Sequence, residues 1–254
     1  MEIAFTKYQG AGNDFIMIDN RGLIFPKDNI DLIHKMCDRR FGIGADGLIL
    51  LEDETSYDFR MVYYNADGKE SSMCGNGGRC IVAFAKELGI IESKANFIAI
   101  DGPHDAEIRE DGKVSLGMID VAVIEEVKPN HYFLNTGSPH YVVVLDELPE
   151  DIITAAREIR NSPRFKKEGV NVNFIKISAN KQVQIRTYER GVEAETLACG
   201  TGSVAAGIIA HRFLQLNEHI ILTKGGLLEV KYESGFTQVR LIGAAVKVFE
   251  GMYN

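Results

Sequence analysis

Two short glycine-rich segments, each containing a cysteine, occur about half a chain apart and constrain the fold more than any other feature of the sequence. They read Met73-Cys74-Gly75-Asn76-Gly77 and Ala198-Cys199-Gly200-Thr201-Gly202 in a chain of 254 residues, and an apolar, helix-like run follows each of them. This spacing indicates an internal duplication that has placed one cysteine in each half. Two opposed thiols acting on one substrate are a natural consequence of such a layout.

Other segments repeat in the same order and at a nearly constant offset. Residues 13–19 align with residues 140–146, and Phe59-Arg60 aligns with Ile185-Arg186. Each half therefore reads as a polar turn, an apolar strand, a glycine-containing turn, a strand with an arginine, a cysteine turn and a helix. Because the period is the size of a domain, the sequence predicts two copies of one fold and not a solenoid.

The hydrophobic pattern predicts an α+β fold in which each half wraps a sheet around a central helix. The runs after the two cysteines, 81–88 and 204–214, are apolar almost all round, and a helix without a polar face belongs inside a layer of sheet. Two surface helices are predicted over 30–38 and 150–161. Strands are predicted over 2–7, 15–19, 48–52, 59–64, 97–101, 141–145, 173–177, 183–188, 220–223, 227–232 and 237–241.

We therefore expect two pseudo-symmetric halves, each a curved and mostly antiparallel β-sheet around one α-helix that carries a cysteine at its N-terminus. The first half is predicted to span residues 1–117 and to be joined by the C-terminal tail, 249–254. The second half is predicted to span residues 118–248. No segment rich in proline, serine or charge separates the two halves.

Composition and charge limit the classes of partner. The net charge is −8 and no basic run exceeds two residues, which argues against nucleic acid and against anionic membrane surfaces. The first residues lack the pattern of a secretion signal, and the apolar runs are too short to span a bilayer. We expect a cytoplasmic protein that acts on a small molecule. The oligomeric state stays open, with a homodimer as one option.

The four cysteines fall into two classes by their surroundings. Cys37 and Cys80 lie among apolar residues and are predicted to be buried thiols, and the chain has no CxxC pair or helical histidine pair that would predict a metal site. Cys74 and Cys199 instead open helices. A helix N-terminus lowers the pKa of a thiol, and its free N–H groups bind anions.

This arrangement suits proton transfer at the α-carbon of an amino acid. The carboxylate would bind to the N–H groups, which also stabilise the negative charge that grows as the α-proton leaves. A simple helix cap or a phosphate loop is the alternative interpretation of one such turn. Neither turn has the Lys-Ser/Thr ending of a phosphate loop, and the occurrence of two equivalent turns favours catalytic thiols.

Several segments together closely resemble the diaminopimelate epimerase family. They are Gly12-Asn13-Asp14-Phe15, Asn65-Ala66-Asp67-Gly68, Met73-Cys74-Gly75-Asn76-Gly77-Gly78-Arg79-Cys80, Tyr188-Glu189-Arg190-Gly191 and Glu195-Thr196-Leu197-Ala198-Cys199-Gly200-Thr201-Gly202. The resemblance extends from residue 3 to about residue 250. It implies two pseudo-symmetric halves and conversion of LL-diaminopimelate to the meso isomer in lysine biosynthesis, without pyridoxal phosphate, metal or nucleotide.

The resemblance also implies roles for individual residues. Cys74 and Cys199 match the two catalytic bases, and His140 and Glu189 match groups that help to set the protonation of the thiols. The residues that match carboxylate-binding helix ends are Gly75, Asn76, Gly200 and Thr201, and those that match other substrate contacts are Asn13, Asn65, Asn171, Glu189 and Arg190. Arg190 is a suitable bidentate partner for the distal carboxylate of the substrate.

Three departures from the family pattern put parts of the substrate site in doubt. Ser138 stands where asparagine is usual, Gly47 stands where glutamine is frequent, and residues 192–194 include one residue more than the usual spacing. One rival interpretation is a proline or hydroxyproline racemase, whereas Cys74 and Cys199 themselves exclude a related isomerase that lacks the thiols. From other classes, a thiol-based redox protein and a non-catalytic amino-acid-binding module stay open.

Overall fold

The computed structural model describes residues 2–71, 73–178 and 180–254, and the chain divides into two compact units. The first unit runs up to Leu116 and is completed by Gly243–Asn254. The second unit is Gly117–Ile242. The return of the chain to the first unit thus begins at Gly243, before the residue 249 expected from the sequence.

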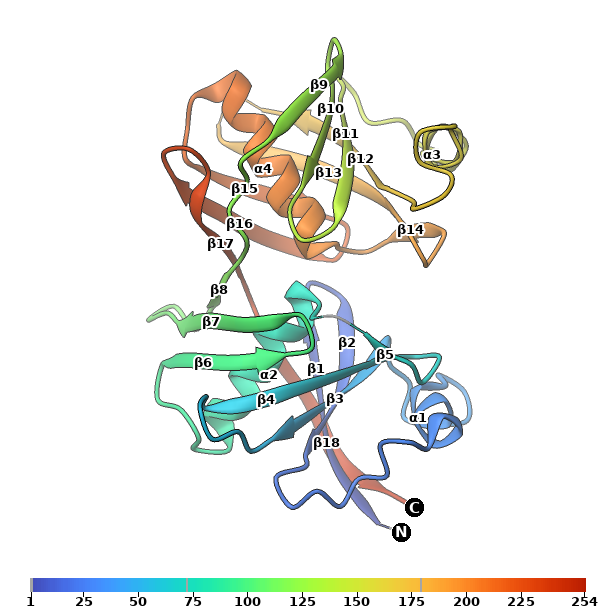
Figure 1. The fold of residues 1–254 in the computed structure, drawn as a ribbon, viewed down its shortest axis with the longest axis vertical. Coiled ribbons are helices and arrows are strands. Elements are labelled where there is room, and N and C mark those ends of the chain that lie inside the picture. Colours follow the sequence, from blue (N-terminus) through green and yellow to red (C-terminus); the bar gives the residue numbers. More distant parts are fainter. Residues whose placement is uncertain (1, 72, 179) are drawn as a thin grey trace. The chain divides into compact units, whose positions relative to one another are not determined.

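The first unit contains one large sheet, two helices and both ends of the chain (Figure 1). Its strands are β1 (Ile3–Gly10), β2 (Asn13–Asp19), β3 (Gly47–Glu52), β4 (Phe59–Asn65), β5 (Glu70–Ser71), β6 (Lys94–Ala99), β7 (Gly102–Ile108), β8 (Val114–Gly117) and β18 (Val246–Tyr253), and its helices are α1 (Ile30–Cys37) and α2 (Gly75–Glu87). The strands pair in the order β18-β1-β2-β3-β4-β6-β7-β8. Only the pairs β2–β3 and β4–β6 are parallel among these.

The second unit repeats this arrangement with its own helix pair. Its strands are β9 (Ile124–Lys128), β10 (His131–Asn135), β11 (Pro139–Val144), β12 (Asn171–Ile177), β13 (Gln182–Glu189), β14 (Ala194–Thr196), β15 (Glu218–Thr223), β16 (Gly226–Glu233) and β17 (Thr237–Gly243), and its helices are α3 (Ile153–Arg160) and α4 (Gly200–Leu214). The order β9-β10-β11-β12-β13-β15-β16 contains two parallel pairs, β11–β12 and β13–β15.

The strand registers confirm the repeat that the sequence predicts. Phe15 pairs with Gly47 in the first unit, and the equivalent residues Val142 and Asn173 pair in the second. In both units a parallel pair, an antiparallel pair, a second parallel pair and a second antiparallel pair follow one another. The predicted fold class, two duplicated α+β halves, is confirmed.

Each central helix is enclosed by the sheet of its own unit, and each outer helix lies apart from it (Figure 1). Residues 75–82 of α2 and 202–210 of α4 are buried, which explains why neither sequence has a polar face. Helix α1 is amphipathic instead. Asn29 caps it by accepting a hydrogen bond from the Leu32 N–H at 3.0 Å, and Ile33, Met36 and Cys37 form its buried stripe.

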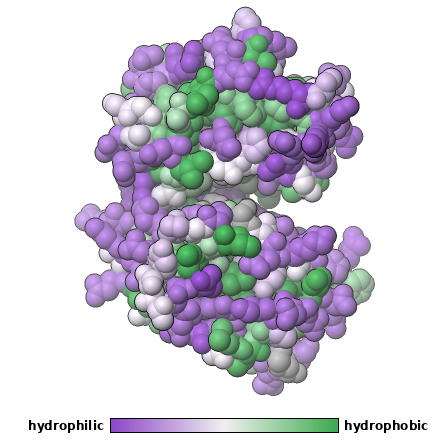
Figure 2. Space-filling view, viewed as in Figure 1, coloured by the Kyte–Doolittle hydropathy of each residue, from purple (hydrophilic) through white to green (hydrophobic). Residues whose placement is uncertain are grey.

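Outside the cores, the visible face of each unit is mostly hydrophilic, with apolar residues in small groups (Figure 2). This distribution agrees with the negative net charge of the chain. Among the described residues, no helix has the length and apolar character needed to cross a membrane.

Candidate active site

Cys74 is the N-cap residue of helix α2, as the sequence predicts for the first thiol. Its backbone is extended (φ −96°, ψ 131°), and the Gly78 N–H donates to the Cys74 carbonyl at 2.7 Å to close the first helical turn. The side chain is half-buried. A Cβ on Gly78 would lie 2.9 Å from Met73 Sδ, so this turn needs glycine in order to pack closely. The N-terminal turn of a helix has N–H groups without intrahelical acceptors, which is the type of site that binds anions.

Two carboxamides adjoin this thiol in the first unit. Cys74 Sγ lies 3.6 Å from Asn13 Oδ1 and donates to it, and Asn76 Nδ2 donates to the same oxygen at 3.3 Å. Asn13 begins strand β2, and Asn76 lies in the first turn of α2. The structure therefore brings together three of the residues that the resemblance assigns to the site.

Arg79 donates hydrogen bonds to two residues of this turn, a role that the sequence did not predict. Its Nη2 donates to Asn76 Oδ1 at 2.9 Å and its Nη1 donates to the Gly75 carbonyl at 3.1 Å, while its Nε is buried with no partner among the described residues. Burial lowers the pKa of Arg79, although the neighbouring thiols Cys80 and Cys74 oppose that shift. The only sequence signal was an arginine inside an otherwise apolar helix.

Asn65 and Gly47 lie at the same end of the neighbouring strands β2, β3 and β4 as Asn13. Gly47 begins β3 beside Phe15 of β2, and on its other side it pairs with Asn65, the last residue of β4. A Cβ on Gly47 would lie 2.6 Å from the Tyr63 ring and 2.5 Å from the Tyr64 carbonyl oxygen. Tyr63 thus fills the space that a longer side chain at position 47 would need, which accounts for this departure from the family pattern.

Cys199 occupies the equivalent N-cap position of helix α4 in the second unit. Its backbone is again extended (φ −117°, ψ 118°), and it is only 8% exposed. Ser203 donates to the Cys199 carbonyl through both its backbone N–H and its hydroxyl, each at 2.9 Å. A Cβ on Gly202 would lie 2.7 Å from Asn173 Oδ1 and 3.4 Å from Cys199 Sγ, so glycine is required beside this thiol.

A hydrogen-bonded chain connects His140 to Cys199. Burial, assisted by the charge of Arg190, lowers the pKa of His140 to about 3, so the imidazole is neutral. Asn173 Nδ2 contacts His140 Nδ1 at 2.9 Å, while Asn173 Oδ1 accepts from the Thr187 hydroxyl at 3.0 Å. Asn171 Nδ2 also lies 3.4 Å from His140 Nε2, but the contact at Nδ1 is much shorter, so Nδ1 accepts and the proton of the neutral ring is on Nε2.

His140 Nε2 lies 2.9 Å from Thr201 Oγ1, and Thr201 Oγ1 lies 3.5 Å from Cys199 Sγ. With Nε2–H donating to Thr201, the threonine hydroxyl can donate its own hydrogen to the sulfur. This direction of donation stabilises a thiolate at Cys199. Asn173, which fixes the tautomer, was not among the residues that the sequence singled out.

Asn171 and Arg190 form a second cluster in this unit, joined by Ser138. Asn171 Oδ1 accepts from the Arg190 backbone N–H at 2.8 Å, and Asn171 Nδ2 donates to Ser138 Oγ at 2.9 Å. Arg190 Nη2 reaches the same Ser138 oxygen at 3.3 Å, and Nη1 donates to the Glu168 carbonyl at 3.0 Å. Ser138 therefore replaces the usual asparagine with a hydroxyl that both side chains contact.

Glu189 ends strand β13, and a tight turn follows it. Its Oε2 accepts from the Thr196 hydroxyl at 3.0 Å across the β13–β14 pair. The Glu193 N–H donates to the Glu189 carbonyl at 2.8 Å, and Glu193 adopts a positive φ of 55°. Arg160 holds the Glu193 carboxylate at 3.0 Å. The extra residue in 192–194 is thus absorbed in a closed turn that an ion pair anchors.

The remaining cysteines are buried, as predicted. Burial raises the pKa of both Cys37 and Cys80 to about 12, so both stay protonated near neutral pH. In the part of the chain that the structure describes, no group of three or more histidine, cysteine, aspartate or glutamate side chains is placed to hold a metal ion.

Comparisons with known proteins agree on the family and the fold. A family model described as "Diaminopimelate epimerase" matches residues 5–124 and 132–248. A diaminopimelate epimerase of Flavobacterium psychrophilum is 54% identical over 250 residues, which cover 96% of this chain and 97% of that protein.

Two solved structures of low sequence identity share the fold along the whole chain. A phenazine biosynthesis protein of the PhzF family from Bacillus anthracis matches with a TM-score of 0.74 at 14% identity, over 100% of this chain and 99% of that one. A hydroxyproline epimerase from Agrobacterium vitis, solved with bound trans-4-hydroxy-L-proline, matches with a TM-score of 0.67 at 14% identity, over 99% and 92% of the two chains.

Proposed function

The chain belongs to the diaminopimelate epimerase family, and we propose that Cys74 and Cys199 are the two acid/base groups of its reaction. That reaction converts LL-2,6-diaminopimelate to the meso isomer in lysine biosynthesis, and the predicted isomerase function is confirmed by the family assignment. Membership in this family sets aside the racemase, redox and binding-module alternatives.

The single observation that carries the proposal is the equivalent placement of the two thiols. Each cysteine is the N-cap residue of the central helix of its unit. Each helix begins with glycine, so its first N–H groups can approach a carboxylate closely. A structural cysteine needs neither feature, whereas a base that acts next to a carboxylate needs both.

The proposed chemistry is a proton exchange at one α-carbon. One cysteine, as thiolate, removes the α-proton and becomes a thiol, and the electron pair of the broken C–H bond moves toward the carboxylate. The other cysteine, as thiol, donates its proton to the opposite face of the carbon and becomes a thiolate. N–H groups around Gly75, Asn76, Gly200 and Thr201 would stabilise the charge on the carboxylate between these two steps.

The surroundings of the two sulfurs support different protonation states. The neutral His140 and the Thr201 hydroxyl form a donating chain toward Cys199, which favours a thiolate. Asn13 Oδ1 is an acceptor toward Cys74, which favours a thiol. We propose that Cys199 is the base and Cys74 the acid in the resting enzyme. The Glu189 carboxylate is the remaining candidate to assist this exchange.

Recognition of the distal end of the substrate is assigned to the polar residues around Arg190. The guanidinium is exposed and held by Ser138 and the Glu168 carbonyl, so it is preoriented for a bidentate contact with a carboxylate. Asn171 fixes the backbone of Arg190. Asn13 and Asn65 are proposed as further substrate contacts, since both lie at one edge of the first sheet.

We also propose that the enzyme is a homodimer and that it works in the cytoplasm. Strand β18 exposes several apolar side chains, namely Val246, Val248, Phe249 and Met252, and such a row suits an interface between two copies. Sedimentation velocity should give a dimer that Phe249→Asp converts to monomer. The cytoplasm is proposed because a mechanism that uses two thiols requires a reducing compartment.

The proposed roles can be tested with a coupled assay for meso-diaminopimelate formed from the LL isomer, with proline as the control substrate. Wild-type protein should convert diaminopimelate only. Cys74→Ala and Cys199→Ala should each lose inversion, because neither thiol alone completes the transfer. Full activity in either variant would contradict the assignment of that cysteine.

A further inference from the structure

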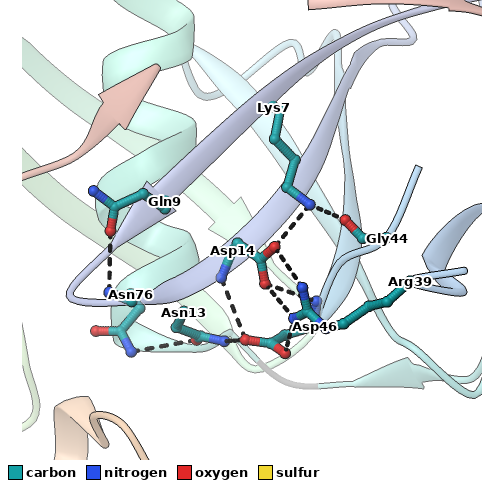
Figure 3. Close-up of polar contacts among 9 residues, drawn as sticks. Lys7, Gln9, Asn13, Asp14, Arg39, Gly44, Asp46 and Asn76 are labelled. Atoms are coloured by element: carbon teal, nitrogen blue, oxygen red, sulfur yellow. Dashed lines mark hydrogen bonds and ion pairs between the residues drawn. The ribbon is translucent and has the colours of Figure 1, made fainter. Parts of the chain in front are cut away.

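The carboxamide of Asn13 lies between Asn76 and a cluster of charged residues (Figure 3), and its oxygen also accepts from the Cys74 thiol. Asn13 Nδ2 donates to Asp46 Oδ2 at 2.5 Å, and Asn13 Oδ1 accepts from Cys74 Sγ at 3.6 Å and from Asn76 Nδ2 at 3.3 Å. A carboxylate can only accept hydrogen bonds. Asn13 must therefore turn its NH2 group to Asp46 and its oxygen to the sulfur.

The same orientation is favoured from the other side by Arg79, which acts through Asn76. A guanidinium can only donate, and it donates to Asn76 Oδ1, which leaves Asn76 Nδ2 for Asn13. The amides of Asn13 and Asn76 thus lie between the Asp46 carboxylate, which only accepts, and the Arg79 guanidinium, which only donates. Reversing the Asn13 amide would place its NH2 group against Asn76 Nδ2 and its oxygen against the Asp46 carboxylate.

Asp46 is itself held in place by ion pairs on neighbouring segments (Figure 3). Arg39 Nη2 contacts Asp46 Oδ1 at 2.7 Å and Asp14 Oδ1 at 2.6 Å, and Lys7 Nζ contacts Asp14 at 2.8 Å. Lys7 is buried and also donates to the Gly44 carbonyl. The Asp14 N–H donates to Asp46 Oδ2 at 3.3 Å. Asp46 is thereby fixed to strands β1 and β2, which carry Lys7 and Asp14.

We propose that Asp46 is a positioning residue, which locks the Asn13 amide so that an oxygen acceptor and not an NH2 donor faces Cys74 and holds its thiol proton. The inference deepens the proposed acid role of Cys74 and rests on it. A carbonyl oxygen bonds to S–H but repels a thiolate. Asp46 would therefore keep Cys74 in its proton-donating form against the helix N-terminus and the Arg79 cation, which both favour ionisation.

The other charged or titratable residues near Cys74 are the same in every variant that changes only Asp46 and Asn13. Arg79 and the neutral Cys80 lie on the same helix, and Asp14 lies on β2. Asp101, which pairs with His104 at 3.2 Å, accepts from the Met73 N–H at 3.3 Å. A double-mutant cycle that changes only Asp46 and Asn13 leaves all of these groups in place.

The experiment measures the pH midpoint of Cys74 alkylation by iodoacetamide, read from the Cys74 peptide by mass spectrometry. The proteins are wild type, Asp46→Ala, Asn13→Leu and the double variant. We expect Asp46→Ala to lower the midpoint by about one pH unit, because only the bond from Asn76 Nδ2 at 3.3 Å then opposes a turn of the Asn13 NH2 group toward the sulfur. In the Asn13→Leu background, Asp46→Ala should lower the midpoint only slightly, through the loss of the Asp46 charge.

Equal shifts in both backgrounds would overturn the proposal, since Asp46 would then act by its charge alone. Asp46→Asn removes the charge but can still present an amide oxygen to the Asn13 NH2 group, so it should keep the midpoint near that of wild type, and a shift equal to that of Asp46→Ala would also overturn the proposal. Asp46→Asn keeps the test available if Asp46→Ala does not fold. The alkylation measurements do not depend on turnover. Activity of the Cys74→Ala protein would therefore refute the proposed function, whereas the role of Asp46 is decided by the alkylation midpoints alone.

Discussion

Replacing Thr201 with valine should raise the pH at which Cys199 ionises, because valine keeps the shape of threonine but lacks the hydroxyl between His140 and the sulfur. The hydroxyl lies 2.9 Å from His140 Nε2 and 3.5 Å from Cys199 Sγ. A hydrogen bond to a charged group contributes about 1.5 to 3 kcal/mol. Loss of that bond from the thiolate corresponds to roughly one to two pH units in the ionisation midpoint.

The change should also reduce catalysis and stability. If Cys199 must be a thiolate to act, kcat/KM near neutral pH should fall by about tenfold to a hundredfold in the Thr201→Val protein. The buried Nε2–H of His140 would lose its acceptor, which costs about 1 to 3 kcal/mol of unfolding free energy. Urea unfolding should show this loss directly.

The assay follows iodoacetamide labelling of the Cys199 peptide against pH, beside the pH profile of kcat/KM. Thr201→Ser is the matched control, because it keeps the hydroxyl and should keep both midpoints. An unchanged Cys199 midpoint in Thr201→Val would refute the inference that His140 and Thr201 donate toward the sulfur.

Three further predictions concern packing, pH and recognition. Gly202→Ala would place a Cβ 2.7 Å from Asn173 Oδ1, so we expect a loss of about 1 to 3 kcal/mol in stability together with most of the activity, measured by urea unfolding and turnover. Burial opposes the ionisation of Asp14, but the hydrogen bonds and charges of Arg39 and Lys7 prevail and lower its pKa to about 2. Its stabilising contribution is therefore complete above about pH 4 and lost as the pH falls toward 2, so the stability gap between wild type and Asp14→Asn should close over that range. Arg190→Met should lower kcat/KM for diaminopimelate by one to several orders of magnitude, and wild-type efficiency would disprove its contact with the distal carboxylate.

The sequence was sufficient to predict the duplicated architecture and the place of the two thiols. Both depend on local patterns: a glycine turn that opens a helix without a polar face, and short apolar strands that recur at a nearly constant offset. Helices α2 and α4 and most central strands accordingly lie where the pattern predicts them. The family resemblance then identified His140, Asn171 and Arg190, which the structure shows in contact with other residues of the second unit.

The missed elements and side chains depend on contacts between distant segments. Strand β18 is exposed along most of its length and has no alternating pattern, and its pairing with β1 joins opposite ends of the chain. Strand β9 is missed for the same reason, because most of its residues are exposed. Asp46 contacts Asn13, and Asn173 contacts His140, in both cases across more than thirty positions of the sequence. Only the strand registers bring the two residues of each pair together.

Hydrogen exchange during turnover shows whether two thiols act as separate acid and base. The LL substrate is incubated with wild-type protein in deuterated water, and deuterium is followed at early times in the meso product and in recovered substrate. We expect label in the product well before label in the remaining substrate, because a solvent-derived proton comes from a thiol other than the one that took the substrate proton. Equal early labelling of both pools would show a single base and would rule out the two-thiol mechanism.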